Sequence, residues 1–312
     1  MAPSLYNMYD KNQYGFLPNS STQCAIISLL HHLQHANNIH RCYERYIISL
    51  DISKAFDSVN HDKLLSILNA NIAQSCFINL IKSYLCNRTQ STKIGSLIGS
   101  RLTVSSGVPQ GSVLGPILFN IYINSLGPSN PSVKYIKYAD DLNLILTAKP
   151  DDNIDELIGD ELQYIKNWCA DNFMVLNNSK TKIIRIDTNR SRLTTSIVAG
   201  MYSTYYADSF CFLGYNIRND LKWSDHIDLA IKKMSSRLHI LRIAKPIMSK
   251  KHLIVIYNGF IQSIYDYCFP IYFNFTENEI KRLSSIRKRA HNIICGSTCS
   301  ENCLPNTEER WK

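Results

Sequence analysis

The chain has 312 residues, 45% apolar and 19% charged, which excludes a disordered chain and allows one large domain or two smaller ones. The formal net charge is +9, and residues 222–312 alone hold 15 Lys and Arg against 8 Asp and Glu, a local net charge of +7. This excess favours a polyanionic partner, although a basic protein without such a partner can have the same composition.

The first third of the chain alternates helical and extended patterns. A helix is predicted over Thr22–Leu33, and the apolar run Tyr46–Leu50 predicts a buried strand that ends at Asp51. Two helices follow, and the second has apolar residues at helical spacing, namely Phe77, Leu80, Ile81, Tyr84 and Leu85. Two glycines within residues 91–105 predict a hairpin.

In the middle of the chain, the sequence pattern predicts a second hairpin with acidic residues at its turn. Residues Gly107–Gly115 form a Gly/Pro loop before an apolar helix over Pro116–Leu126, because proline suits a helix start. Strands are predicted at Lys134–Tyr138 and Leu142–Thr147, on either side of Ala139-Asp140-Asp141. The leucines of the second strand alternate, so they lie on one face.

In the rest of the chain, the sequence pattern predicts a region of helix and strands followed by a helical region. A helix is expected over Asp152–Asn172, strands at Met174–Leu176 and Lys182–Ile186, and a hairpin at Phe212–Ile217. From Ser224 onward the pattern is helical and basic. This order of elements predicts an α+β domain followed by a helical one.

The sequence predicts no membrane span. The uncharged stretch Leu102–Val133 is interrupted by glycine, proline, serine and amide side chains, so it is not a continuous apolar segment. No signal peptide is recognised either. We therefore expect an intracellular protein, in the nucleus, the cytoplasm or both, without a membrane partner.

The ten cysteines include no Cys-x-x-Cys pair. Free thiols in a reducing compartment are the default expectation. A zinc site made by His291, Cys295, Cys299 and Cys303 is an alternative, but this spacing matches no common ligand pattern.

Three acids point to metal-dependent chemistry. Asp140 and Asp141 repel each other in a tight turn, and Asp51 ends another apolar strand that is expected to lie beside this turn. Aspartate is also common in turns for purely structural reasons. Three carboxylates from two neighbouring strands, however, can hold two divalent ions roughly 4 Å apart, an arrangement suited to in-line nucleotidyl transfer. Such oxygen ligands suit Mg²⁺.

Six segments, in a fixed order, resemble the motifs of reverse transcriptases, the RNA-directed DNA polymerases. They are a second fingers motif at 14–22 (YGFLPNSST), a first catalytic motif at 49–59 (SLDISKAFDSV), a template- and nucleotide-gripping motif at 106–112 (SGVPQGS), a Y-x-D-D turn at 138–141 (YADD), a fourth motif at 176–181 (LNNSKT) and a primer-grip hairpin at 212–215 (FLGY). The amino-acid sequences of these motifs are most similar to those of non-LTR (LINE-type) retrotransposon enzymes. Group II intron enzymes are the nearest relatives, and telomerase and retroviral enzymes match less well.

The resemblance implies a right-hand polymerase palm, which is an antiparallel sheet packed on helices, with partial fingers and a helical thumb. Its implied domains are partial fingers at 1–45, a palm at 46–221 with an inserted fingers segment at about 60–105, and a basic helical thumb and tail at 222–312. The chain begins at a point that corresponds to the middle of the fingers, so the resemblance implies that upstream residues holding the triphosphate are lacking.

The resemblance also implies residue roles. The metal ligands for Mg²⁺, or alternatively Mn²⁺, are Asp51, Asp140, Asp141 and the backbone carbonyl of Ile52. The nucleotide and template are contacted by Phe56, Pro109, Gln110 and Gly111, with Phe56 as a steric gate against ribonucleotides. A core aromatic is the alternative interpretation of Phe56. The primer grip consists of Phe212, Leu213, Gly214 and Tyr215.

Lys180 is the implied proton donor, or charge stabiliser, for the leaving pyrophosphate, and Lys182 is its rival. Asp57 and Asp62 are interpreted as helix-start residues. The implied partners are an RNA template, a DNA primer or target, and deoxynucleoside triphosphates. The basic helices of the last third are expected to contact duplex phosphates, although solvated helix faces also carry such charges.

Two other functions compete with a polymerase. One is a nucleic-acid-binding remnant of such an enzyme that no longer catalyses synthesis. The other is a palm-fold nucleotide cyclase, which also uses paired acids but leaves the segment Val108–Gly111 and the basic last third unexplained.

Overall fold

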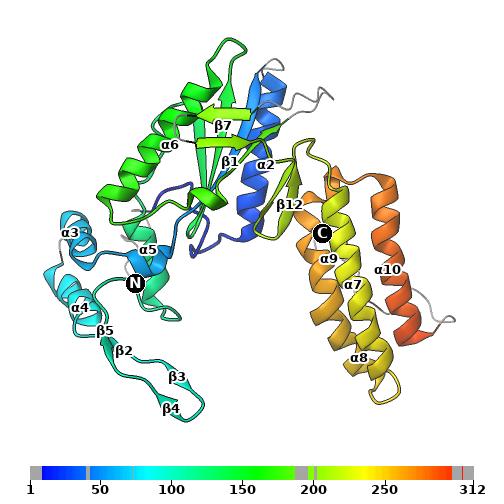
Figure 1. The fold of residues 1–312 in the computed structure, drawn as a ribbon. Coiled ribbons are helices and arrows are strands. Elements are labelled where there is room, and N and C mark those ends of the chain that lie inside the picture. Colours follow the sequence, from blue (N-terminus) through cyan, green and yellow to red (C-terminus); the bar gives the residue numbers. More distant parts are fainter. Residues whose placement is uncertain are drawn as a thin grey trace. The chain divides into compact units, whose positions relative to one another are not determined.

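The computed structural model describes residues 9–39, 43–72, 74–186, 196–199, 202–296 and Leu304. The chain forms two compact units, and the division between them falls between Ala207 and Asp208. Helices and antiparallel strands both occur, as the α+β prediction requires (Figure 1). Among the described residues, no helix is both long enough and apolar enough to cross a membrane.

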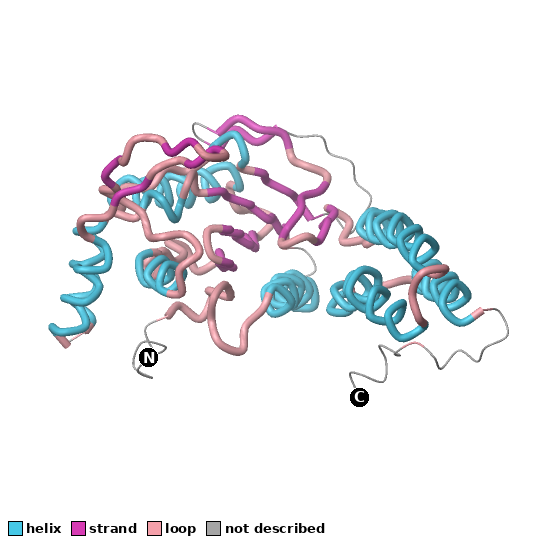
Figure 2. The backbone as a smooth tube through the Cα atoms, turned by 90° about the horizontal axis from the view of Figure 1, so that it is seen from below, coloured by secondary structure: helices cyan, strands magenta, loops and turns pink. Residues whose placement is uncertain are grey.

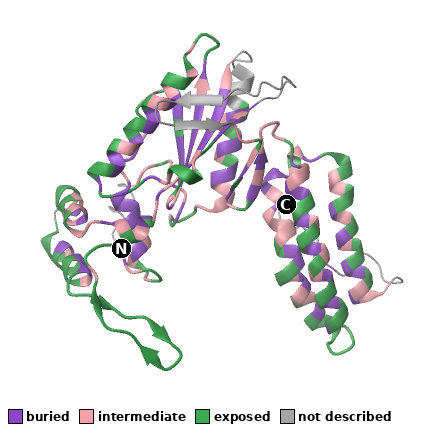
Figure 3. Cartoon of the chain, viewed as in Figure 1, coloured by how far each residue is buried: buried purple, intermediate pink, exposed green. Residues whose placement is uncertain are grey.

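A four-stranded antiparallel sheet organises the first unit. Its strands lie in the order β6-β7-β1-β8, and they comprise β1 (Glu44–Asp51), β6 (Val133–Tyr138), β7 (Asp141–Ala148) and β8 (Lys182–Ile186). Each strand contains or matches a strand predicted from the sequence. The central strands are buried on both faces, which explains their nearly continuous apolar runs (Figure 3).

Helices cover the two faces of this sheet. On one face, Leu142, Leu144 and Leu146 share a core with residues of α5 (Leu114–Tyr122) and α6 (Ile154–Asp171), so the predicted alternation is confirmed. On the other face, α2 (Thr22–Ile39) lies against β6 and β7. Helix α5 begins two residues before the predicted Pro116, because Ser112 Oγ accepts a hydrogen bond from the N–H of Gly115 at 3.0 Å.

Two helices and a thin ribbon form the segment between β1 and α5. They are α3 (His61–Asn71), α4 (Ser75–Leu85), and a ribbon in which β2 (Thr89–Gln90) pairs with β5 (Leu102–Thr103) and β3 (Lys93–Ile94) pairs with β4 (Leu97–Ile98). The predicted hairpin is thus confirmed, and its residues are exposed (Figure 3).

Two local predictions are wrong. Leu80 does not belong to the buried face of α4, because it is 62% exposed and Ile78 is buried instead. Residues Met174–Leu176 do not form a strand. Only Leu176 makes a bridge, to Ile52, because β1 ends at Asp51 and offers no longer edge to pair with. A further strand pair, β9 (Ser196–Ala199) with β10 (Tyr202–Tyr205), was not predicted.

The second unit begins with the predicted hairpin. Strand β11 (Ser209–Phe212) pairs with β12 (Tyr215–Arg218). The helical elements that follow are α7 (Ser224–Ala244), α8 (Lys250–Tyr257), a π-helical turn (Asn258–Gln262), α9 (Ser263–Tyr267), a 3-10 helix (Phe269–Asn274) and α10 (Glu277–Cys295) (Figure 2).

The hairpin is attached to these helices by two tyrosines. The hydroxyl of Tyr215 donates to the carbonyl of Tyr267, the hydroxyl of Tyr267 donates to the carbonyl of Leu213, and the two rings stack at 4.8 Å. The hairpin therefore belongs to the second unit, whereas the expected palm at 46–221 included it with the sheet.

Candidate active site

Three acidic residues gather where two paired strands end. Asp51 is the last residue of β1 and lies directly opposite Asp141, the first residue of β7. Directly opposite Cα atoms in an antiparallel pair are about 4.5–5.5 Å apart. Tyr138 and Asp141 pair at the end of β6 and the start of β7, and Asp140 is the second residue of the two-residue loop between them. The register thus brings together the three acids that the sequence singled out.

The charges of these acids oppose one another. The pKa of Asp141 is raised, first because protein atoms around its carboxylate remove solvent and then because Asp140 and Asp51 carry like charges; Lys180 acts in the opposite direction. Asp141 as a whole residue is nevertheless exposed. Like charges at this spacing are relieved when a cation binds between them.

One of the three carboxylates forms an ion pair with a lysine. Lys180 Nζ lies 3.1 Å from Asp51 Oδ2, and Asn177 Nδ2 donates to the same oxygen at 3.2 Å. Lys182, the rival candidate, is exposed on β8 opposite Ser49. The structure thus brings Lys180, and not Lys182, to the acids.

The donor set suits a hard divalent cation, but the side chains are not gathered around one. Among the described residues, no group of three or more His, Cys, Asp and Glu side chains is arranged to hold a metal ion, and this includes the three acids. In this structure the Asp51 carboxylate is paired with the Lys180 ammonium group. Of the alternative zinc site, Cys299 and Cys303 lie outside the described residues.

Hydrogen bonds of its two neighbours fix the backbone around Ile52. Ser53 N–H donates to the Val175 carbonyl at 2.8 Å, and Asn177 N–H donates to the Asp51 carbonyl at 2.8 Å. Since the N–H and the C=O of one trans peptide group point in opposite directions, the carbonyl of Ile52 points away from Val175.

Phe56 lies between two other phenylalanines. Its ring stacks on Phe119 with centroids 4.2 Å apart and meets the exposed Phe16 edge-on at 6.2 Å. The side chain is half-buried, so it packs against the core and keeps one side accessible. This arrangement is compatible with both predicted roles, the core aromatic and the steric gate.

The Gly/Pro loop at Gly107–Gly115 is hydrogen-bonded to the segment that contains Phe56. Val108 N–H donates to the Phe56 carbonyl at 2.9 Å, and Gly107 N–H donates to the Val59 carbonyl at 2.7 Å. Gln110 Nε2 donates to Asp57 Oδ1 at 2.8 Å. The structure therefore joins Phe56 with the loop that contains Pro109 and Gly111. Asp57, expected only as a helix-start residue, orients Gln110. Asp62 lies in the first turn of α3 as expected.

The predicted primer-grip residues form the turn of the hairpin in the second unit. Leu213 and Gly214 both have positive φ, 47° and 84°, as a two-residue hairpin loop requires. Gly214 also lines a cavity of about 320 Å³ together with His226 and Cys268. Burial lowers the pKa of His226 to about 4 and raises that of Cys268 to about 12, so both groups are neutral at pH 7.

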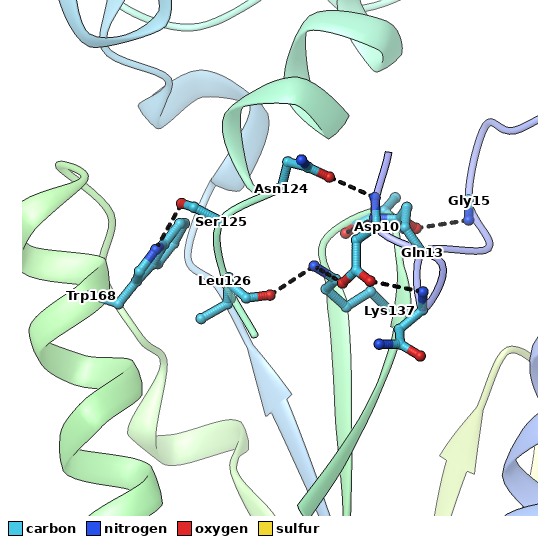
Figure 4. Close-up of polar contacts among 10 residues, drawn as sticks. Asp10, Gln13, Gly15, Asn124, Ser125, Leu126, Lys137 and Trp168 are labelled. Carbon is cyan, nitrogen blue, oxygen red and sulfur yellow. Dashed lines mark hydrogen bonds and ion pairs between the residues drawn. The ribbon is translucent and has the colours of Figure 1, made fainter. Parts of the chain in front are cut away.

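Two contributors to the site were missed from the sequence. Gln13 hydrogen-bonds to Ala139 in the acidic turn. The buried Lys137 is the last residue but one of β6, the strand before this turn (Figure 4). Lys137 carried a signal, because it continues the alternation of Val133 and Tyr135 on the inward face of β6, where an unpaired cation is costly. Gln13 carried none.

A family model described as "Reverse transcriptase (RNA-dependent DNA polymerase)" matches residues 1–217. The chain is 24% identical, over 79% of its length, to "Probable RNA-directed DNA polymerase from transposon X-element" of Drosophila melanogaster, and 24% identical, over 91% of its length, to that from transposon BS of the same species. It spans only 28% and 32% of these two relatives. It is also 26% identical, over 57% of its length, to "RNA-directed DNA polymerase from mobile element jockey" of Drosophila melanogaster, of which it spans 20%.

Among solved structures, apo telomerase from Candida tropicalis superposes with a TM-score of 0.53 at 13% identity, covering 91% of this chain and 52% of that one. At this identity the likeness shows the fold alone, and it confirms the predicted palm-type α+β fold. The relatives confirm the predicted kinship with enzymes of non-LTR retrotransposons. Because the family model covers more than two thirds of the sequence, the chain belongs to the reverse transcriptase (RNA-dependent DNA polymerase) family.

Proposed function

We propose that this chain catalyses RNA-templated DNA synthesis by deoxynucleotidyl transfer, as part of a non-LTR retrotransposon. The observation that carries the proposal is the register of Asp51 opposite Asp141, with Asp140 in the adjoining turn. It puts three carboxylates at one edge of a rigid sheet, which is the placement that two-metal nucleotidyl transfer requires.

In the proposed mechanism, two Mg²⁺ or Mn²⁺ ions would be held by Asp51, Asp140, Asp141 and the Ile52 carbonyl. When bound, these ions lower the pKa of the primer 3′-hydroxyl and neutralise the triphosphate. Lys180 then leaves Asp51 and donates a proton to the departing pyrophosphate, or stabilises its charge. Phe56 lies beneath the sugar of the incoming nucleotide, and Pro109, Gln110 and Gly111 contact the nucleotide and template.

The charge distribution supports a nucleic-acid partner. Residues 63–139 contain seven Lys and Arg and no Asp or Glu. Arg88, Lys93 and Arg101, in and beside the β2–β5 ribbon, are exposed, as is Lys232 on α7. Their proposed contacts are with template and primer phosphates, which makes binding strongly salt-dependent and only weakly dependent on sequence.

A second candidate is nucleic-acid binding without synthesis. One observation favours it, namely that Asp51 is paired with Lys180 in this structure. Primer extension on an RNA template with deoxynucleotides and Mg²⁺, beside the Asp140→Asn/Asp141→Asn variant, separates the two. Extension that the variant lacks supports the polymerase, whereas salt-sensitive binding without extension supports the binding protein.

Lys180→Met is expected to tighten metal binding and slow synthesis. Removing the competing cation frees Asp51, and an exposed ion pair contributes about 0.2–1 kcal/mol, so we expect Mn²⁺ affinity to rise by about 1.4- to 5-fold. Loss of a proton donor is expected to slow single-turnover extension by roughly 10²-fold. Lys182→Met is the matched control, and an equal slowing in that variant would contradict the assignment.

Phe56→Val is expected to relax sugar discrimination. A smaller side chain leaves room for a 2′-hydroxyl, and a pocket change of this size alters selectivity by roughly 10–100-fold. The measurement is the ratio of kcat/KM for deoxy- and ribonucleotides on one template. Phe273→Val, at an exposed position in the second unit, serves as control. An unchanged ratio with lowered thermal stability would identify Phe56 as a core residue only.

A further inference from the structure

The acidic turn contains an alanine in an unfavourable conformation. Ala139 has φ +55°, at the first position of a two-residue hairpin loop where glycine is the usual residue. Residues with a Cβ pay about 1–2 kcal/mol for the left-handed region, and such positions persist only where the surroundings fix them. The conformation of Ala139 determines the direction in which the next residue, Asp140, leaves the strand.

The side-chain amide of Gln13 hydrogen-bonds to both the backbone N–H and the backbone carbonyl of this alanine. Gln13 Oε1 accepts the N–H of Ala139 at 2.9 Å, and Gln13 Nε2 donates to the carbonyl of Ala139 at 3.4 Å. The same Oε1 accepts the N–H of Gly15 at 2.7 Å. Gln13 is only 4% exposed, so water cannot replace these bonds when the amide is removed.

The backbone around Gln13 runs along strand β6. The N–H of Lys137 donates to the Asn12 carbonyl at 2.8 Å, and the N–H of Tyr14 donates to the Lys137 carbonyl at 2.8 Å. These bonds form a parallel bridge between Gln13 and Lys137. Contact with the turn is so close that a Cβ on Gly15 would lie 2.4 Å from the nitrogen of Ala139. Only glycine is accommodated there.

A buried ion pair anchors the same segment below the turn. Lys137 Nζ lies 2.7 Å from Asp10 Oδ2 and donates to the Leu126 carbonyl at 2.8 Å, and the N–H of Asp10 donates to Asn124 Oδ1 at 2.6 Å (Figure 4). Lys137 is 1% exposed; burial lowers its pKa, and Asp10 counteracts this. Residues 10–15 are thereby held between β6 and the segment that follows α5, so Gln13 has little freedom to move away.

We propose that Gln13 is a positioning residue for the acidic turn, and that its amide, by fixing Ala139, sets the affinity of Asp140 and Asp141 for divalent cations. Asp140 and Asp141 repel each other, so without the amide the loop relaxes toward negative φ and the two carboxylates separate. This inference rests on the metal-binding role of the acids within the proposed function.

The test compares metal binding with stability in the full chain. Gln13→Met keeps the side-chain length and removes both bonds to Ala139. Since partners that orient metal-binding residues typically account for 10–100-fold in affinity, we expect Mn²⁺ binding, measured calorimetrically, to weaken by about tenfold or more. The matched control is Tyr135→Phe, which removes a buried hydrogen bond to Glu161 from the same strand without contact to the turn. Its thermal stability falls, but its Mn²⁺ affinity remains that of the wild type.

Each outcome bears on the proposal. Weakened Mn²⁺ binding in Gln13→Met, at a stability no lower than that of Tyr135→Phe, supports it. A loss of stability with unchanged Mn²⁺ affinity shows a structural role and overturns it. If Gln13→Met does not fold, Gln13→Asn, which keeps the amide but is one methylene too short to reach Ala139, undergoes the same comparison.

Failure of the proposed function is distinguishable from failure of this inference. If the Asp140→Asn/Asp141→Asn variant binds Mn²⁺ as tightly as the wild type, the acids are not the metal site and both proposals fall. If that variant loses binding and Gln13→Met does not, only the role of Gln13 is rejected.

Discussion

Replacing Asp140 and Asp141 together by Asn is expected to lower primer extension by about 10³-fold or more and to leave the fold at least as stable as before. Metal ions stabilise transition-state charge by several kcal/mol, and each 1.36 kcal/mol is a tenfold change in rate. In the absence of metal, the same two carboxylates repel each other and Asp51, so neutral amides relieve that repulsion. The acids are thus expected to favour catalysis at the expense of stability.

The effect on stability depends on pH in a defined direction. The pKa of Asp141 in the folded chain is raised above its ordinary value of 3.8. Between these two pKa values the folded state binds more protons than the unfolded state, so the stability of the wild type falls as pH rises through this range. The double Asn variant lacks this decline. Its advantage in Tm over the wild type is therefore expected to be larger at pH 7 than at pH 3.5.

Thermal unfolding at these two pH values, without metal, measures the difference. Asp62→Asn, at an exposed position in the first turn of α3, is the control for the loss of a surface carboxylate. It is expected to extend primers at the wild-type rate. A double variant that keeps more than a tenth of the extension rate, or one that is less stable than Asp62→Asn at pH 7, would count against the assignment of the acids.

Gly107→Ala is expected to destabilise the first unit by about 3 kcal/mol, because it combines backbone strain with overpacking. Gly107 has φ +88°, and a Cβ there would lie 2.8 Å from the Cα of Asp57 and 2.9 Å from its carbonyl oxygen. The backbone cannot retreat easily, since the Gly107 N–H bonds to Val59 and its carbonyl lies 2.8 Å from His61 Nε2.

The same substitution is expected to impair nucleotide binding at temperatures where the chain stays folded. Displacing the loop from Asp57 breaks the hydrogen bond from Gln110, so KM for deoxynucleotides rises. Gly127→Ala is the matched control, since nothing lies within 4 Å of its added Cβ. Its stability is expected to stay within about 0.5 kcal/mol of the wild type. Urea titrations compare the two variants, and equal unfolding midpoints would contradict the role given to Gly107.

Local pattern in the sequence determined the elements that carry the acids. Strand periodicity predicted β6 and β7 with the turn at Asp140 and Asp141, and the apolar run before Asp51 predicted β1. The alternation of Leu142 with its neighbours assigned the buried face, because neighbouring side chains of a strand point to opposite faces. The Gly/Pro loop was predictable for the same reason, since these residues restrict the backbone locally.

Tertiary structure decided every feature that depends on a partner distant in the chain. Whether Lys180 or Lys182 reaches Asp51 depends on how the segment after α6 returns to β1. The failure of Met174–Leu176 to become a strand has the same origin, because a strand needs a paired edge and β1 ends at Asp51. Periodicity describes a segment's own faces and contains no information about which other segment covers them.

Gln13 shows this limit most clearly. It precedes the turn that it contacts by more than a hundred residues, in a polar stretch without any periodic pattern. Its sequence neighbours do not distinguish it from a solvent-exposed glutamine. Only the folded chain brings its amide to Ala139, whose conformation needs support, because hydrogen bonds depend on distance and direction in space. The sequence by itself therefore determined the acids and the strands that carry them, and the tertiary structure decided which residues hold them in place.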